Sequence, residues 1–199
     1  MKTLIIIFLT ITNALCYNSL DEVISEASDG NPAALYNLGL VYYGYRVKMD
    51  NGILIGENVR KNPTRAFECF SEAAENIKNY MFADELAAKI CYMLGNCYNY
   101  GIGVEKNEHM AFQAWMIGAD GNNADAQYEV SKCYGEGRGI AKNVTLAKQW
   151  LNIAAQNGCL KARASQGDLG YFIGLAAKKI KEEGAPVIQS IKDGYNNNR

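Results

Sequence analysis

Two stretches of the chain spell nearly the same pattern, YMLGNCYNYGIG at residues 92–103 and YEVSKCYGEGRG at residues 128–139. The offset between them is 36 residues, from Tyr92 to Tyr128. A shorter third copy, YNLGLVY, begins at Tyr36. A period in the thirties is typical of repeat arrays, which stack similar units into a long surface instead of closing around a catalytic cleft. The pattern therefore favours a binding protein.

Each copy predicts a first helix, here called helix A, built around one leucine or valine. That residue, the next one and the fourth one after it share a face at about 3.6 residues per turn. The three sets are Leu38, Gly39 and Tyr42; Leu94, Gly95 and Tyr98; and Val130, Ser131 and Tyr134. We expect the small middle residue to let a second helix approach closely. Glycine ends helix A because it adopts positive φ without strain, at Gly101, Gly103, Gly137 and Gly139.

A second helix, helix B, is predicted to begin at an asparagine in every copy. Asparagine is a strong N-cap, since its side chain accepts hydrogen bonds from first-turn amides. The three caps are Asn62, Asn107 and Asn143, and alanines follow each at four and twelve residues (Ala66 and Ala74, Ala111 and Ala119, Ala147 and Ala155). Trp115 and Trp150 add bulk to the same helices. The caps, breaks and small contact positions agree on one repeating unit.

These observations predict an all-α fold, an α-α superhelix (solenoid) of about three helix-turn-helix repeats with capping helices. The expected segments are a signal peptide (1–16), an N-terminal capping helix (17–29), repeat 1 (30–75) with an insertion (45–58), an inserted connector (76–88), repeat 2 (89–121), repeat 3 (122–158), a C-terminal capping helix (159–185) and a tail (186–199).

The insertion at residues 45–58 carries a hairpin signal. Asn51 and Gly52 lie between alternating apolar residues, and Asn-Gly in that setting favours a two-residue β-turn. A hairpin protruding from the array would be a contact element. An irregular loop folded back over the helix ends is an equally good interpretation.

The first 16 residues resemble an export signal. Lys2 is followed by the apolar run from Leu4 to Ile11, with small or polar residues near Ala14. We expect cleavage after Cys16 and a periplasmic or secreted protein. The alternatives are a buried N-terminal helix or a lipoprotein anchored at Cys16. The run is much shorter than the roughly 20 residues of a transmembrane span, and no such span is expected.

Charge and cysteine usage argue against nucleic-acid-binding proteins, metal sites and catalytic sites. Twenty lysines and arginines balance 21 aspartates and glutamates, so nucleic acid is not an expected partner. Cys97 and Cys133 occupy equivalent repeat positions, too far apart for a disulfide and better explained as buried apolar residues. One bridge among Cys69, Cys91 and Cys159 stays open. The single histidine, His109, has no nucleophile spaced to match it, so we expect no catalytic residues, metal or cofactor.

The two halves of the repeat resemble the Sel1-like repeat, a relative of the tetratricopeptide repeat. Residues 90–104 (ICYMLGNCYNYGIGV) carry one half and residues 147–158 (AKQWLNIAAQNG) the other. The resemblance implies an adaptor that brings other proteins together. It also implies an alternative, because a cysteine-rich branch is linked to penicillin binding and weak β-lactamase activity. Cys91 matches the second cysteine of that branch, while alanine stands at Ala74, near its expected partner.

One flank of helix A is the predicted partner-binding surface. The residues two before, two after and five after the central leucine or valine share that flank. They are Tyr36, Leu40, Tyr43, Tyr92, Asn96, Asn99, Tyr128 and Lys132, with Gly135 at the last position. Tyrosine rings and amides suit recognition of a protein or peptide. A residue that recurs in every copy often serves the recurring interface, so packing between repeats is the favoured explanation of the recurring tyrosines. A purely structural envelope protein is a third hypothesis.

Overall fold

The chain has the all-α solenoid architecture that the repeat predicts. A computed structural model of the 199-residue protein describes residues 19–48, 54–56, 59–77 and 84–167. Its elements are α2 (Leu20–Ser28), α3 (Pro32–Tyr43), β1 (Val47–Lys48), β2 (Leu54–Ile55), α4 (Pro63–Asn76), α5 (Asp84–Tyr100), α6 (Glu108–Asp120), α7 (Ala124–Glu136), α8 (Val144–Gln156) and α9 (Leu160–Ser165). The signal peptide expected at 1–16 and the tail at 186–199 lie outside the described residues.

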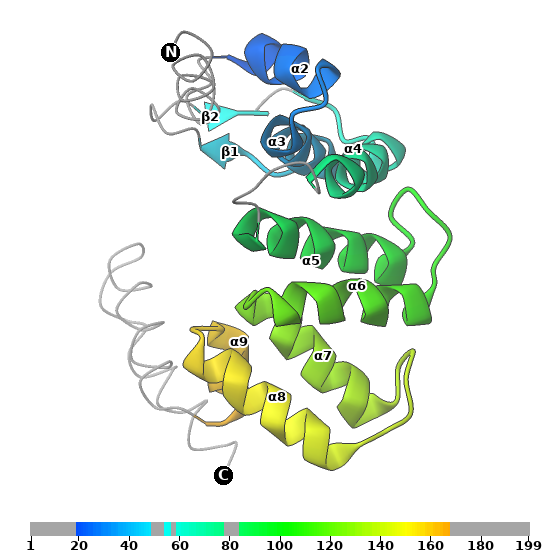
Figure 1. Cartoon of the computed structure of the whole chain (residues 1–199), viewed down its shortest axis with the longest axis vertical. Coiled ribbons are helices and arrows are strands. Elements are labelled where there is room, and N and C mark those ends of the chain that lie inside the picture. Colours follow the sequence, from blue (N-terminus) through cyan, green and yellow to red (C-terminus); the bar gives the residue numbers. More distant parts are fainter. Residues whose placement is uncertain (1–18, 49–53, 57–58, 78–83, 168–199) are drawn as a thin grey trace, which may run out of the picture.

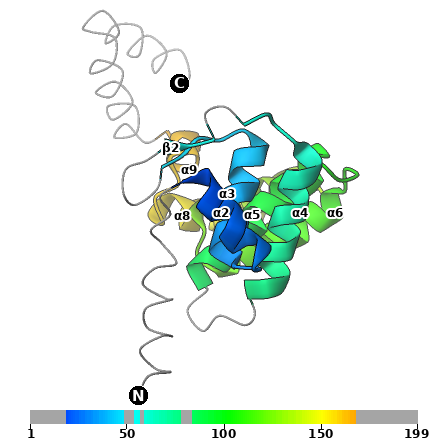
Figure 2. The ribbon, with the colours of Figure 1, turned by 90° about the horizontal axis from the view of Figure 1, so that it is seen from above.

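Three helix pairs follow one another along the long axis (Figure 1). Each pair joins a helix A to its helix B: α3 with α4, α5 with α6, and α7 with α8. Helix α2 packs on α3 at one end, and α9 packs on α8 at the other. Seen from above, α4 and α6 lie on one side of α3, and α8 and α9 lie on the other (Figure 2). Successive pairs are therefore rotated, as in a superhelix.

In repeats 1 and 2, the two helices of a pair meet at a glycine of helix A, which has no side chain to keep them apart. A Cβ atom added to Gly39 would lie 2.6 Å from the Phe70 ring, and one added to Gly95 would lie 2.3 Å from the Trp115 ring. The ring of helix B therefore rests directly on the backbone of helix A in repeats 1 and 2. This close approach confirms the expected role of the small residue.

The asparagines at the start of helix B connect the two helices of each repeat. Every one of them donates its backbone N–H to the carbonyl of the tyrosine near the end of helix A: Asn62 to Tyr42 (2.9 Å), Asn107 to Tyr98 (2.8 Å) and Asn143 to Tyr134 (2.8 Å). Each side-chain Oδ1 accepts from the first turn of its own helix B, at the amides of Arg65, Met110 and Leu146. The predicted N-caps are confirmed, and the same residues also fix the turn.

Neighbouring repeats meet at the second glycine after helix A. Gly103 lies against the backbone of Pro63, and Gly139 against that of Glu108, so that a Cβ atom on either glycine would fall 2.1 Å from a carbonyl oxygen. Both glycines also have positive φ, 72° and 68°. The turn of one repeat thus rests on the first turn of helix B in the repeat before it.

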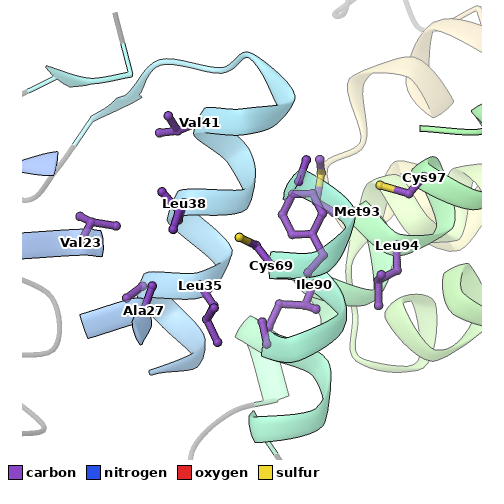
Figure 3. Close-up of a cluster of buried hydrophobic side chains, with 14 of the residues drawn as sticks. Val23, Ala27, Leu35, Leu38, Val41, Cys69, Ile90, Met93, Leu94 and Cys97 are labelled. Carbon is purple, nitrogen blue, oxygen red and sulfur yellow. The ribbon is translucent and has the colours of Figure 1, made fainter. Parts of the chain in front are cut away.

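The buried side chains form a series of clusters along the stack. The largest spans α2 to α5 and includes Phe70, Ile90 and Cys97 (Figure 3). A second surrounds Trp115 and Val130, and a small third lies between α8 and α9. All five described cysteines (Cys69, Cys91, Cys97, Cys133 and Cys159) are free thiols. The disulfide left open among three of them is therefore absent from this structure.

The two ends of the insertion in repeat 1 form an antiparallel pair, in a register one residue away from the one that a two-residue turn at Asn51 and Gly52 would set. Val47 lies opposite Ile55 in an antiparallel pair, and Lys48 lies opposite Leu54. Ile55 is only 4% exposed and belongs to the large cluster. The base of the insertion is thus folded onto the helices, and residues 49–53 lie outside the described part.

One helix begins earlier than the segment expected for it. Helix α5 begins at Asp84, inside the expected connector, and has 17 residues against 12 in α3. Its extra turn buries Ala88, and Glu85 forms an i,i+4 ion pair with Lys89 at 2.7 Å, so these residues favour helix. Helix α9 ends at Ser165, two residues before Gly167 with its positive φ (74°), and the rest of the capping helix expected to residue 185 lies outside the described residues from 168 on.

The helix-A glycines generate a matched stability test. We expect Gly95→Ala to destabilise the protein by about 1–3 kcal/mol, because the new methyl group overlaps the Trp115 ring. Gly135→Ala, also in a helix A, would place its Cβ 3.6 Å from the Ala147 methyl group, an ordinary contact. It should stabilise by about 0.5 kcal/mol through helix propensity. Urea unfolding measures both, and equal effects would contradict the close-approach explanation.

The glycines that follow helix A and helix B give a second matched pair of substitutions. Gly139→Ala should cost about 3 kcal/mol, since it combines backbone strain with a clash against the Glu108 carbonyl. Gly158 has positive φ (93°) and nothing within 4 Å of an added Cβ, so Gly158→Ala should cost only the strain, about 1 kcal/mol. Thermal or urea unfolding separates the two. If Gly158→Ala lowers the free energy of unfolding as much as Gly139→Ala does, backbone strain accounts for both effects and the clash with the Glu108 carbonyl for neither.

Candidate partner-binding face

The helix-A face is the flank of α3, α5 and α7 that carries the eight predicted residues. The tyrosines that recur on it, Tyr36, Tyr92 and Tyr128, are all half-buried, each with part of its ring accessible. Leu40 and Tyr43 are half-buried as well. Lys132 leaves 32% of its side chain exposed.

Five tyrosines gather where α3 and α5 meet on this face. Tyr36 and Tyr43 both pack on Phe70, with ring centroids 6.0 and 6.5 Å away. Tyr43 stacks on Tyr45 at 5.4 Å with an interplanar angle of 7°. Tyr92 and Tyr100 of α5 are counted with them because, after burial, Tyr45 and Cys97, they also raise the pKa of Tyr43. We call Tyr36, Tyr43, Tyr45, Tyr92 and Tyr100 the tyrosine cluster.

The tyrosine cluster combines buried and exposed rings. Tyr45 and Tyr100 are 51% and 62% exposed, while Tyr36 and Tyr43 are largely covered. Burial first, and then the neighbouring Tyr45 hydroxyl, raise the pKa of Tyr36 and Tyr43 to about 12. Their hydroxyls therefore stay protonated at physiological pH and can donate hydrogen bonds.

The α7 end of the face is charged. Glu129 is buried, and its carboxylate lies 2.8 Å from the Lys132 ammonium and 3.9 Å from the Arg138 guanidinium. Arg138 also donates to the side-chain oxygen of Asn99, at 3.1 Å, and so connects repeat 3 to repeat 2. The Lys132 ammonium lies 5.4 Å from the centre of the Tyr128 ring.

The two predicted asparagines are buried rather than exposed. Asn96 is 9% exposed and hydrogen-bonds Tyr92, and Asn99, at 6%, accepts from Arg138. Their side chains contribute to packing between the helices. The binding role proposed for the eight residues stays a prediction, and it is most plausible for the six outside the core.

Sequence reasoning missed two features of this face. Tyr45 and Tyr100 lie just beyond the helix-A positions that the prediction included. Their exposure depends on the direction that the chain takes in the turn after helix A. A signal did exist for the ion network. Glu129 stands where the other copies have Met93 and Asn37, and a buried carboxylate needs a cation; Lys132 supplies it at 2.8 Å and Arg138 adds a second at 3.9 Å.

Three of the described thiols are poorly suited to nucleophilic chemistry. Burial, above all, raises the pKa of the Cys97 thiol to about 12 and that of Cys69 and Cys133 to about 11, so these thiols are poor nucleophiles. His109 places Nδ1 3.0 Å from the Gly139 carbonyl and therefore donates to it, which adds to the contact between repeats. Residues 19–48, 54–56, 59–77 and 84–167 contain no group of three or more potential metal ligands, and none of their helices could span a membrane.

The segments that match a known family coincide broadly with the three repeats. The family model of the Sel1 repeat matches residues 32–76, 88–113 and 124–159. The chain belongs to the Sel1 repeat family. A Sel1 repeat protein from Oxalobacter formigenes is 28% identical to this Sel1 repeat protein, with a TM-score of 0.57 over 75% of this chain and 97% of the other.

Two more solved structures are similar at lower scores. Helicobacter pylori cysteine rich protein B is 18% identical, with a TM-score of 0.49 over 73% of this chain and 95% of that one. A protective antigen of uropathogenic Escherichia coli strains, which displays an SLR fold, is 18% identical, with a TM-score of 0.38 over 85% of this chain and 45% of that one.

The ion network predicts a stability difference between two arginines. We expect Arg138→Met to destabilise the protein by about 1–3 kcal/mol, because Glu129 stays buried and loses one cation while Asn99 loses its donor. Arg65→Met is the control: its ion pair with Glu68 is exposed (66% and 53%), so the change should be below about 0.5 kcal/mol. Urea unfolding measures both, and an unchanged midpoint for Arg138→Met would refute the network.

Proposed function

We propose that this Sel1 repeat protein is an exported adaptor that binds a protein or peptide through its helix-A face. The observation that carries the proposal is the tyrosine cluster, which places two exposed rings beside two partly covered ones on the repeat surface. Tyrosine supplies large contact area and a polar hydroxyl at low entropic cost, and it is enriched among the residues that dominate interface energies.

The neighbouring charged end supports the same proposal. Arg138 and Lys132 are held in place by Glu129, so the surface beside the rings is ordered by ion pairs within the protein. An interface commonly combines aromatic anchors with a polar rim, and this face offers both. The varying residues Leu40 and Lys132 would then adjust specificity along the array.

Export is proposed from the sequence alone. Its support is the short apolar run after Lys2 and the small residues that follow. Four of the five described thiols are protected by burial and Cys91 is half-buried, so the fold is compatible with an oxidising compartment without a cross-link among them. The hydrolase implied by resemblance to the cysteine-rich branch gains no support, because Cys91 is a free thiol here.

Site-specific photo-crosslinking tests the adaptor proposal. A photoreactive phenylalanine replaces Tyr100 in the full chain, and the protein is irradiated in its native compartment. We expect a discrete cross-linked partner, because Tyr100 is 62% exposed within the tyrosine cluster. The control places the same group at Ile117, which is 59% exposed on α6, a helix that contributes nothing to this face.

The comparison of the two sites decides the outcome. A partner joined through position 100 and not through position 117 supports the proposal. Replacing Leu40 by alanine, which removes apolar area from the same face, should reduce that cross-link several-fold. Identical products from both sites, or none from either, would sink the adaptor function.

A further inference from the structure

The segment that joins α3 to α4, residues 44–62, concentrates positive charge. None of its described residues is acidic, and four are exposed cations: Arg46, Lys48, Arg60 and Lys61. Its two acidic residues, Asp50 and Glu57, lie outside the described part. Four cations against two anions leave the segment a formal charge of +2, while the whole chain has −1, so all other residues together carry −3. One end of an otherwise acidic protein is therefore basic.

Part of this positive charge lies beside two stacked rings. Tyr43 and Tyr45 stack with ring centroids 5.4 Å apart, and Tyr45 is 51% exposed. The Lys61 side chain lies against Gly44, the residue between the two tyrosines, so that a Cβ atom added to this glycine would be 3.0 Å from Nζ. Arg60, the preceding residue, is exposed as well.

The short strands bring a further cation to the same place. Lys48 of β1 lies opposite Leu54 of β2. Two residues later Gly56 packs against the Tyr45 carbonyl, where an added Cβ atom would be 3.0 Å from the oxygen, and the chain then continues to Arg60. Both strands lie beside α3, at the end of the stack away from α8 (Figure 1). We call the exposed cations and the stacked rings the basic aromatic patch: Tyr43, Tyr45, Lys48, Arg60 and Lys61.

The repeat itself explains only one of the three cations. A lysine precedes the helix-B asparagine in every copy, at Lys61, Lys106 and Lys142. Lys61 also lies at the C-terminal end of α3, where a cation is favourable. Arg60 is replaced by Glu105 and Ala141 in the other copies, and Lys48 belongs to the insertion that they lack. Neither Lys48 nor Arg60 forms an ion pair with any residue in the described part of the chain.

The patch complements carboxylates. Ammonium and guanidinium groups donate charge-assisted hydrogen bonds to carboxylate oxygens, and these bonds are stronger than neutral ones. The phenol hydroxyls of Tyr43 and Tyr45 are additional donors beside the cations. A nucleic-acid strand matches less well, because a long polyanion would extend from the small patch over a chain whose other residues carry −3.

We propose that the basic aromatic patch binds an acidic segment of the partner, rich in aspartate or glutamate. This inference rests on the proposed adaptor function and names the chemistry of the segment that the adaptor recognises. Carboxylates of the segment pair with Lys48 and Arg60, and the exposed Tyr45 ring contacts the chain between them.

Titration of the full chain with decaglutamate tests the inference. Binding is followed by calorimetry and by amide chemical shifts, with a ten-residue glycine-serine peptide as the uncharged control. We expect decaglutamate to bind at low salt with a Kd of about 0.1–1 mM, and the glycine-serine peptide about tenfold more weakly or worse. Salt at about 0.3 M should weaken decaglutamate binding roughly fivefold, because exposed charges are screened.

Charge reversals identify the surface. Lys48→Glu with Arg60→Glu should weaken decaglutamate binding about tenfold or more, because two attractions become repulsions. Lys48→Arg with Arg60→Lys keeps both charges and should keep binding within about twofold. The control, Lys142→Glu with Lys148→Glu, changes the net charge equally at two exposed lysines of repeat 3, and should alter binding less than about twofold. Unfolding midpoints confirm that every variant is folded.

Each contrary outcome has a distinct meaning. Equal binding of decaglutamate and the glycine-serine peptide, or the same loss from both charge-reversal pairs, overturns the inference. So does decathymidylate binding that is tighter than decaglutamate binding and depends on Lys48 and Arg60. If the cross-link at position 100 persists in these cases, the adaptor function stands and only the acidic segment is wrong; if the cross-link is also absent, both fail.

Discussion

The structure depends on backbone contacts that are possible only where a Cβ atom is missing. Gly39 and Gly95 let an aromatic ring of helix B lie on the backbone of helix A, and Gly103 and Gly139 let one repeat rest on the next. The first contact sets the geometry within a pair, and the second sets the geometry between pairs. The cost is visible at Trp115, whose indole N–H is buried without a hydrogen-bond partner.

The third repeat solves the same packing problem differently. Ser131 replaces glycine and bonds the Tyr128 carbonyl in its own helix, and the helix-B tryptophan is displaced by one position, to Trp150. Its interface with repeat 2 includes the buried carboxylate of Glu129, which pairs with Lys132 and Arg138. One face of the array is therefore rich in aromatic rings near α3 and in ion pairs near α7, although both regions derive from the same repeat.

The fold was predictable from the sequence because its signals are local and recur. The asparagine caps, the glycines after helix A and the small residue beside Leu94 each carry their own physical reason. The site was less predictable, because periodicity gives the direction of a side chain and not its exposure. Asn96 and Asn99 point along the expected flank, yet neighbouring repeats cover them, while Tyr100 is exposed by the turn that follows. The length of α5 was missed because its extra turn lies in an insertion without a second copy.

The last described helix differs from its counterparts at the residue that starts it. Asn31 and Asn123 cap α3 and α7 with their side chains, whereas Cys159 makes no such bond to α9, which has only six residues. In a linear stack, each unit is stabilised by its own hydrogen bonds and by its immediate neighbours. No disulfide among the described cysteines ties distant units together. Within the described part of the chain we therefore expect α9 to unfold locally before α7, and the aromatic region near α3 to be unaffected by that opening.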